Sequence, residues 1–205
     1  MIKSDNISDY KKHTTDPIYK SDNRNTTTNS DTRLENRKLR LAILGAGGIA
    51  RKMAETVNRM EKVELYAVAS RTEEKARQFA DTYHASRWYG SYEEMVADDG
   101  IDLVYIATPH SHHKEHTMLC LNHNRAVLCE KAFAVNTKEA EDMIRLAKEK
   151  NILLAEAMWV RYMPMSFTLK EIIDSDVIGK ITGLTANLGY SLMQVERLIR
   201  PELAG

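Results

Sequence analysis

A glycine-rich loop behind a short apolar run is the feature that most limits how this chain can fold. The apolar run is Leu39–Leu44, and the loop has the pattern G-x-G-x-x-A before an amphipathic stretch begins. The first glycine permits a tight turn, the second lets the backbone approach a pyrophosphate, and the small third residue allows close helix–strand packing. The N-terminus of the following helix stabilises an anion. The loop therefore predicts a dinucleotide site, made by Gly45, Ala46, Gly47, Gly48, Ile49 and Ala50.

Further strand-like runs alternate with helical patterns along the central region. The strand-like runs are Val63–Ala69, Asp102–Thr108, Ala126–Glu130 and Ile152–Met158. Strands that alternate with helices at this spacing predict βαβ units, and right-handed crossovers turn such units into a doubly wound parallel sheet. The fold class is therefore α/β, with a Rossmann-type sheet whose ligands lie beyond the carboxyl ends of the strands.

The intervening segments carry helix signals of their own. The first helical segment, after the glycine-rich loop, has an apolar stripe. In a later segment, Ser91–Glu94 fits a capping box at the start of a short helix. A further helix begins at Asn136, with Ala140, Met143, Ile144 and Ala147 as its stripe. The stripe of the first helix is predicted to consist of Ile49, Met53, Ala54, Val57 and Met60.

Both ends of the chain differ from this alternating region. More than half of the first 38 residues are Asn, Asp, Ser or Thr, a composition that cannot bury enough apolar surface to order a chain. Near the other end, a helical pattern over Met165–Ile173 precedes one strand-like run, Ile181–Leu188. We expect a disordered polar tail (residues 1–38), a dinucleotide-binding domain (39–162) and the first helix and strand of a truncated second domain (163–205).

The two residues that follow the second strand-like run indicate which dinucleotide binds. NAD sites usually place a carboxylate there for the ribose hydroxyls, whereas this chain has Ser70 and Arg71. A hydroxyl and a guanidinium suit a 2′-phosphate, and Arg71 can stack on adenine. An ordinary helix cap followed by a surface arginine is the alternative. We expect NADP, with NAD as the second choice.

Four histidines follow the run Asp102–Thr108. His112 and His116 are four residues apart, a spacing that raises the question of a metal site. No HExxH pattern, acidic ligand partner or cysteine pairing accompanies them, so no metal is expected. The residues expected beside the cofactor are instead Thr108, Pro109, His110 and His113, the last near its phosphate–nicotinamide end.

Glu130 and Lys131 come after the run Ala126–Cys129. A lysine there would project over the sheet edge toward a bound nicotinamide. Partial desolvation lowers the pKa of a lysine, which suits it to protonate or orient a carbonyl or hydroxyl. A surface lysine paired with its neighbouring glutamate explains the pattern equally well.

Together these motifs resemble the Gfo/Idh/MocA oxidoreductases, over roughly residues 39–189. The matching segments are Gly45–Ala50, Ala69–Arg71, Ala107–His110 with His113, and Glu130–Lys131. Glu156–Pro164 is similar to the dihydrodiol dehydrogenase and glucose–fructose oxidoreductase branch. The resemblance implies a Rossmann domain followed by an open, mostly antiparallel sheet domain that supplies much of the substrate pocket and often the dimer interface.

The resemblance also implies roles for single residues. Lys131 matches the lysine of the family's E-K-P motif, which contacts substrate and cofactor, and Glu130 matches the acid on the cofactor side. Trp159 and Arg161 match positions near the nicotinamide and the substrate. Ala132 stands where proline is usual. The family's downstream Asp and His acid/base motif would lie beyond the end of this chain.

Two main classes of function are compatible with these residues. The first is an NADP-preferring oxidoreductase that moves hydride between nicotinamide and a secondary alcohol or carbonyl of a sugar, polyol or dihydrodiol, with Lys131 assisting proton transfer. The second is a dinucleotide-binding module without catalysis, either a redox sensor or a remnant. A zinc hydrolase that uses the histidines is a third, and it requires bound metal.

Composition limits the partners and the location. The chain has 29 basic and 29 acidic residues, which removes the electrostatic case for nucleic-acid binding. No apolar run is long enough to span a bilayer, and the first residues carry no apolar core of a signal peptide. The two cysteines have no metal or redox spacing. We expect a cytoplasmic protein with a small-molecule substrate, homo-oligomeric when full-length.

Overall fold

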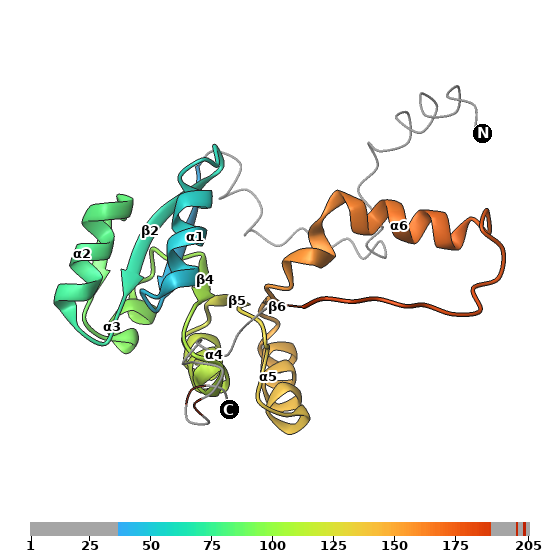
Figure 1. Ribbon diagram of the computed structural model, residues 1–205. Helices are drawn as coiled ribbons and strands as arrows, with labels where there is room; N and C mark the ends of the chain where they lie inside the picture. Colours follow the sequence, from blue (N-terminus) through green and yellow to red (C-terminus); the bar gives the residue numbers. More distant parts are fainter. Residues whose placement is uncertain (1–36, 190–199, 201–202, 204–205) are drawn as a thin grey trace. The chain divides into compact units, whose positions relative to one another are not determined.

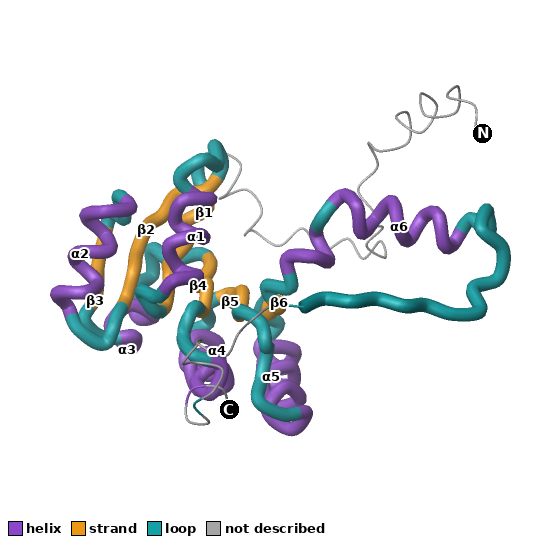
Figure 2. Tube along the Cα trace, in the orientation of Figure 1, coloured by secondary structure: helices purple, strands orange, loops and turns teal. Residues whose placement is uncertain are grey.

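Six parallel strands form one sheet in the computed structural model, which describes residues 37–189, Arg200 and Leu203. The predicted polar tail lies almost entirely outside the described residues. The strand order is β3-β2-β1-β4-β5-β6, and every neighbouring pair is parallel (Figure 1 and Figure 2). The strands are β1 (Leu39–Leu44), β2 (Val63–Ala69), β3 (Arg87–Tyr89), β4 (Leu103–Ile106), β5 (Ala126–Cys129) and β6 (Leu154–Glu156). The predicted doubly wound α/β fold is confirmed, and its strand order reverses between β1 and β4.

Helices connect successive strands, as Figure 2 shows in purple. They are α1 (Gly48–Val57), α2 (Glu73–Tyr83), α3 (Tyr92–Ala97), α4 (His113–Asn122), α5 (Thr137–Lys150) and α6 (Pro164–Asp174), with short 3-10 turns η4 (His110–His112) and η5 (Trp159–Tyr162). Two predicted caps are present: Glu94 N donates to Ser91 Oγ, and Glu139 N donates to Asn136 Oδ1. Each cap satisfies an amide that the first helical turn leaves without a partner.

The sheet is covered on both faces, because alternate residues of each strand point to opposite sides. Ala42 and Leu44 of β1 belong to a core cluster with residues of α3, α4 and α5. Leu41 and Ile43 belong to a second cluster with residues of α1 and α2. Burial on both faces explains why the strands are almost continuously apolar in sequence.

The predicted stripe of the first helix is partly wrong. Ala50, Ala54 and Val57 are the buried residues of α1, whereas Ile49 is 37% exposed. Met60 lies beyond the end of the helix and is 49% exposed. The helix packs close to the sheet, so its inner face is made largely of alanines, which periodicity of large apolar residues does not detect.

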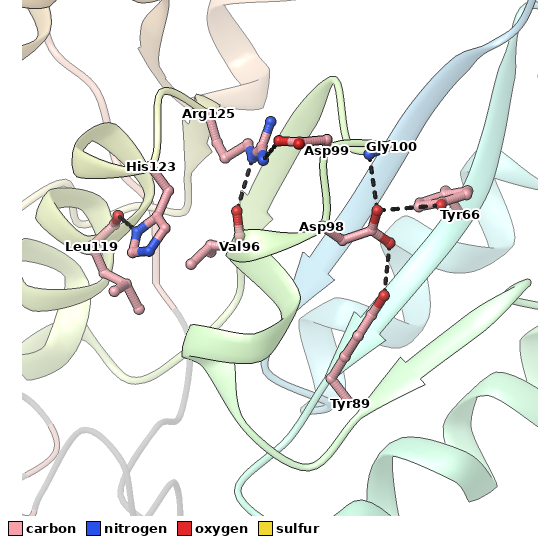
Figure 3. A network of polar contacts seen from close by, with 9 residues as sticks. All are labelled: Tyr66, Tyr89, Val96, Asp98, Asp99, Gly100, Leu119, His123 and Arg125. Carbon is pink, nitrogen blue, oxygen red and sulfur yellow. Dashed lines mark hydrogen bonds and ion pairs between the residues drawn. The ribbon is translucent and has the colours of Figure 1, made fainter.

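A polar network fixes the turns that precede β4 and β5 (Figure 3). The Asp98 carboxylate accepts hydrogen bonds from Gly100 N at 2.8 Å and from the Tyr89 hydroxyl at 2.6 Å. Arg125 donates to Val96 O and pairs with Asp99. Since these turns lead into the amino ends of the strands, the network stabilises the edge opposite the carboxyl ends, where ligands bind in such sheets.

The prediction of a strand over Ile181–Leu188 is wrong, because residues 180–189 have no regular secondary structure. A strand needs a neighbouring strand to satisfy its backbone, and within residues 37–189 no strand after β6 is available to pair with it. The apolar side chains of this segment are accordingly exposed: Leu184 by 90% and Leu188 by 84%. Among the described residues, no helix has the length and apolar character that crossing a membrane requires.

Candidate functional site

A cavity of about 550 Å³ lies where β1, β2 and β4 end, at the reversal of strand order. Ligand sites of α/β sheets occur at this place, and the volume suits a small ligand. Seven residues expected at a cofactor site line it: Gly45, Ala46, Gly47, Ser70, Arg71, Thr108 and Pro109. Loops that are far apart in sequence therefore meet here, because parallel strands deliver their carboxyl ends to one edge.

The first residue of the loop behind β1 has to be glycine. Gly45 has φ +102°, a conformation that side chains rarely adopt. A Cβ atom there would lie 2.9 Å from Thr108 Cγ2 and 3.2 Å from the Ala107 carbonyl carbon. The loop thus turns tightly against the end of β4, while the fully buried Ala50 lets α1 pack close behind it.

The N-terminus of α1 is open to an anion. Gly47 is its N-cap and has no side chain to bond the first amides, and the first turn contains no acidic residue. Such a turn leaves several N–H groups without helical partners, and the helix dipole adds a partial positive charge. Since Gly47 lines the cavity, this arrangement suits a phosphate group there.

Two cations line the cavity beyond β2. Ser70 is buried, and the exposed Arg71 follows it into the cavity wall. Lys75, in the first turn of α2, also lines the cavity and was missed by sequence reasoning. Its place in the first turn of the helix that directly follows Ser70 and Arg71 was the available signal.

Two histidines and an aromatic ring form another part of the wall. His116 Nδ1 is hydrogen-bonded to Thr108 Oγ1 at 2.9 Å, and the His116 ring meets Tyr92 edge-on at 4.8 Å. Burial lowers the pKa of His116 to about 4, so the ring is neutral near pH 7. His112 stacks on it at 5.7 Å. In the described part of the chain, no group of three or more His, Cys, Asp or Glu residues gathers that could hold a metal ion.

Sequence reasoning considered these two histidines only as metal ligands and did not expect them in the cavity wall. It also missed Tyr92, which follows the capping serine of α3. The position of His116, in the first turn of the helix that follows β4, was the available signal for the histidine. The remaining unexpected lining residues of the described chain include Glu93, Glu115 and Leu119.

His113 occupies a different position from the one expected. Its side chain is fully buried, and neither His113 nor His110 lines the cavity. The His113 ring lies 2.7 Å from Ala132 O through Nδ1 and 3.0 Å from Thr108 O through Nε2. Its nitrogens are therefore occupied by backbone carbonyls of two loops.

The loop behind β5 is held by side chains of the neighbouring strands. The Tyr105 hydroxyl, from β4, donates to Glu130 Oε1 at 2.5 Å, and Lys131 N donates to Glu130 Oε2 at 3.1 Å. Phe133 N donates to Glu156 Oε1 of β6 at 3.2 Å. Burial, followed by the hydrogen bond to Glu130, raises the pKa of Tyr105, so its hydroxyl keeps the proton that it donates.

Lys131 is left as the unpaired group of this loop. Its side chain is partly buried, and among the described residues its ammonium has no hydrogen bond or ion pair. The alternative of a surface pair with Glu130 is not formed, because that carboxylate faces Tyr105 and the backbone. The peptide bond between Lys131 and Ala132 is cis. Lys131 follows β5 at the same edge of the sheet as the cavity, although it does not line the cavity.

Trp159 and Arg161 also follow this edge, in η5 directly behind β6. Trp159 is 64% exposed and Arg161 is exposed, and neither lines the cavity. Gly48, Ile49, Ala50 and Glu130 likewise do not line it. The structure thus brings together the residues behind β1, β2 and β4, and leaves those behind β5 and β6 as a separate group.

Comparison with known proteins identifies the class of protein that this fold and cavity define. Residues 39–158 match the Gfo/Idh/MocA oxidoreductase family with its NAD-binding Rossmann fold. The chain belongs to this family, as the resemblance predicted.

The curated relatives include several dehydrogenases. A D-xylose 1-dehydrogenase (NADP(+)) of Hypocrea jecorina is 38% identical, over 82% of this chain and 48% of the relative. A trans-1,2-dihydrobenzene-1,2-diol dehydrogenase of Danio rerio is 35% identical, over 82% of this chain and 51% of the relative. A scyllo-inositol 2-dehydrogenase (NADP(+)) of Bacillus subtilis is 40% identical, over 73% and 45%. The chain spans about half the length of these relatives.

Solved structures agree with this assignment. An NAD binding oxidoreductase from Klebsiella pneumoniae superimposes with a TM-score of 0.66 at 27% identity, covering 69% of this chain and 40% of that one. A 3-ketoreductase from Actinomadura kijaniata, solved with NADP, gives a TM-score of 0.65 at 25% identity, covering 71% and 46%.

Proposed function

We propose that this chain binds NADP and serves a dehydrogenase reaction, in which hydride moves between nicotinamide and a secondary alcohol or carbonyl of a sugar, polyol or dihydrodiol. The observation that carries the proposal is one cavity that combines the uncapped N-terminus of α1 with the cations Arg71 and Lys75. The relatives support the substrate class, since they are named for a sugar, a dihydrodiol and an inositol.

The groups present fit a dinucleotide that carries a third phosphate. The amides of the first turn of α1 would hold the pyrophosphate, because they are not satisfied by a cap. Ser70, Arg71 and Lys75 would hold the 2′-phosphate through one hydroxyl and two cations. NAD lacks that phosphate and would leave both cations without a partner, which favours NADP. When bound, the nicotinamide supplies the hydride chemistry.

Lys131 is the residue to which we assign proton transfer. Its ammonium is free to hold or give a proton at the substrate oxygen, because Glu130 is engaged by Tyr105. Trp159 and Arg161 are proposed to border the nicotinamide and the substrate. The remaining proposals are a cytoplasmic location and a homo-oligomeric full-length protein.

Cofactor choice can be tested with matched arginine variants. Arg71→Ala is expected to weaken NADP binding about 10- to 100-fold and to change NAD binding little, because a charge-assisted contact is worth about 1.5–3 kcal/mol. Lys75→Ala should act in the same direction. Arg77→Ala is the control, since Arg77 lies on α2 outside the cavity. Calorimetric titration measures all three, and equal NADP affinities in wild type and Arg71→Ala would refute the proposed phosphate site.

Turnover separates the enzyme from a dinucleotide-binding module without catalysis. The purified chain is incubated with NADP and a panel of aldoses, polyols and diols, and reduced nicotinamide is followed by its absorbance. Turnover that is lost in Lys131→Ala, with NADP affinity retained, supports the assigned role. NADP binding without any turnover would favour the module.

A further inference from the structure

His113 is unusual because both nitrogens of a fully buried ring face backbone carbonyls. Nδ1 lies 2.7 Å from Ala132 O, and Nε2 lies 3.0 Å from Thr108 O. A carbonyl oxygen can only accept a hydrogen bond, so the ring bonds both carbonyls at once only if each nitrogen carries a proton. An imidazole that donates from both nitrogens carries two protons and is therefore an imidazolium.

The two carbonyls belong to different loops, one after β4 in the cavity wall and one after β5 beside Lys131. Thr108 lines the cavity behind β4, and its hydroxyl is bonded to His116. Ala132 directly follows Lys131 in the loop behind β5. The His113 ring thus joins the cavity wall to the backbone beside the unpaired lysine, and it does so from the first residue of α4.

The surroundings of His113 contain other titratable groups. The His110 ring of η4 meets it edge-on at 5.5 Å, and His116 lies one helical turn further along α4. Glu130 and Lys131 are in the loop to which it donates. Glu130 is held by Tyr105, and the neutral His116 adds no second positive charge near pH 7. A doubly protonated ring thus has two strong acceptors in place of a carboxylate partner.

We propose that His113 is a positioning residue for Lys131. The His113 ring acts as a clamp that donates a hydrogen bond to the Thr108 carbonyl and another to the Ala132 carbonyl. It thereby holds the Lys131 loop against the cofactor cavity. This proposal rests on the role assigned to Lys131 above. The bond geometry, by contrast, can be examined in the protein without cofactor or substrate. His113 itself is fully buried and does not line the cavity.

The first test uses the unmodified chain. Nitrogen-15 NMR of the histidine side chains, assigned with His113→Asn, reports whether each ring nitrogen carries a proton near neutral pH. The expected result is two protonated nitrogens whose hydrogens exchange slowly with water, because both are buried in hydrogen bonds. A ring with one bare nitrogen would overturn the clamp, whatever happens to any variant.

The second test asks whether the clamp reaches Lys131. Lysine side chains are dimethylated with carbon-13, which keeps their charge, and the Lys131 signal is assigned with Lys131→Arg. His113→Asn is expected to shift the Lys131 signal while the other lysine signals stay in place. His123→Asn is the matched control, because His123 lies at the end of the same helix and bonds only the nearby Leu119 O (Figure 3). An unmoved Lys131 signal in a folded His113→Asn chain would refute the positioning role.

The outcomes remain distinguishable from failure of the proposed function. Both measurements are made without NADP, so absent NADP binding would overturn the cofactor proposal and leave the clamp standing. If NADP binds and the Lys131 signal does not depend on His113, only the positioning role fails. Should His113→Asn not fold, His113→Gln replaces it both for assigning the nitrogen-15 signals and for the Lys131 measurement.

Discussion

The cavity behind β1, β2 and β4 and the segment from η5 onward differ in how well their side chains are packed. Around the cavity, Gly45 packs on Thr108, and His113, His116 and Tyr105 all have partners. From η5 onward, large apolar side chains face solvent, among them Trp159, Leu169 and Leu184. The side chains around the cavity are therefore packed and hydrogen-bonded within the described chain. The segment from η5 onward instead presents apolar surface of the kind that packs against other protein.

The largest expected difference between the two regions is in packing energy. Leu121→Ala in α4 removes a fully buried side chain and should lower the free energy of unfolding by about 2–5 kcal/mol. Leu169→Ala in α6 removes a side chain that is 54% exposed and should change it by less than about 0.5 kcal/mol. Urea unfolding measures both. Equal losses would show that α6 is packed as tightly as the Rossmann core.

A smaller effect tests the tight turn of the cavity wall. Gly45→Ala should lower the free energy of unfolding by about 2–4 kcal/mol, because the new Cβ meets Thr108 at a positive φ. Gly48→Ala is the matched control, since a Cβ there meets nothing within 4 Å, and it should leave stability unchanged or raise it by up to about 1 kcal/mol. Thermal unfolding compares the two, and a Gly45→Ala chain as stable as Gly48→Ala would contradict the described loop.

The pH dependence of stability tests the wall at His116. Its pKa is lowered from 6.5 to about 4 by burial, so between these values the unfolded chain binds a proton that the folded chain does not. The stability that depends on His116 is therefore complete above pH 6.5 and is lost as the pH falls toward 4, by at most about 3 kcal/mol.

His116→Asn should flatten this part of the stability profile, and His123→Asn, on the same helix but exposed, should leave it as it is. Urea unfolding at a series of pH values gives the profile. A profile that is equally steep in wild type and His116→Asn would place the acid sensitivity elsewhere.

Much of the fold could be predicted from the sequence because the strands are buried on both faces. The runs Leu39–Leu44 and Val63–Ala69 form strands with the predicted bounds. Glycine or polar residues flank each apolar run and so mark where its strand starts and ends. Three-residue β3 gave no such signal, because two of its residues are exposed. The segment Ile181–Leu188 shows the opposite error: its pattern suits a strand, yet pairing depends on a partner that the pattern cannot supply.

The candidate site was predictable where a residue's role depends on its place directly after a strand, and less so where it depends on side-chain direction. The loop at Gly45 and the pair Ser70–Arg71 were found from their position alone. Lys75 was missed because it lies within α2 rather than at a strand end. His113 was placed beside the cofactor, but its ring turns inward to two carbonyls, and sequence position does not show which way a helix-starting side chain points.

We propose the cavity at the reversal of strand order as a dinucleotide site, and titration of the purified chain with NADP and with NAD decides whether it is one. We expect saturable binding of one NADP per chain, tighter than NAD, and competition between the two. A chain that is folded by circular dichroism and gives no saturable heat with either dinucleotide would contradict it.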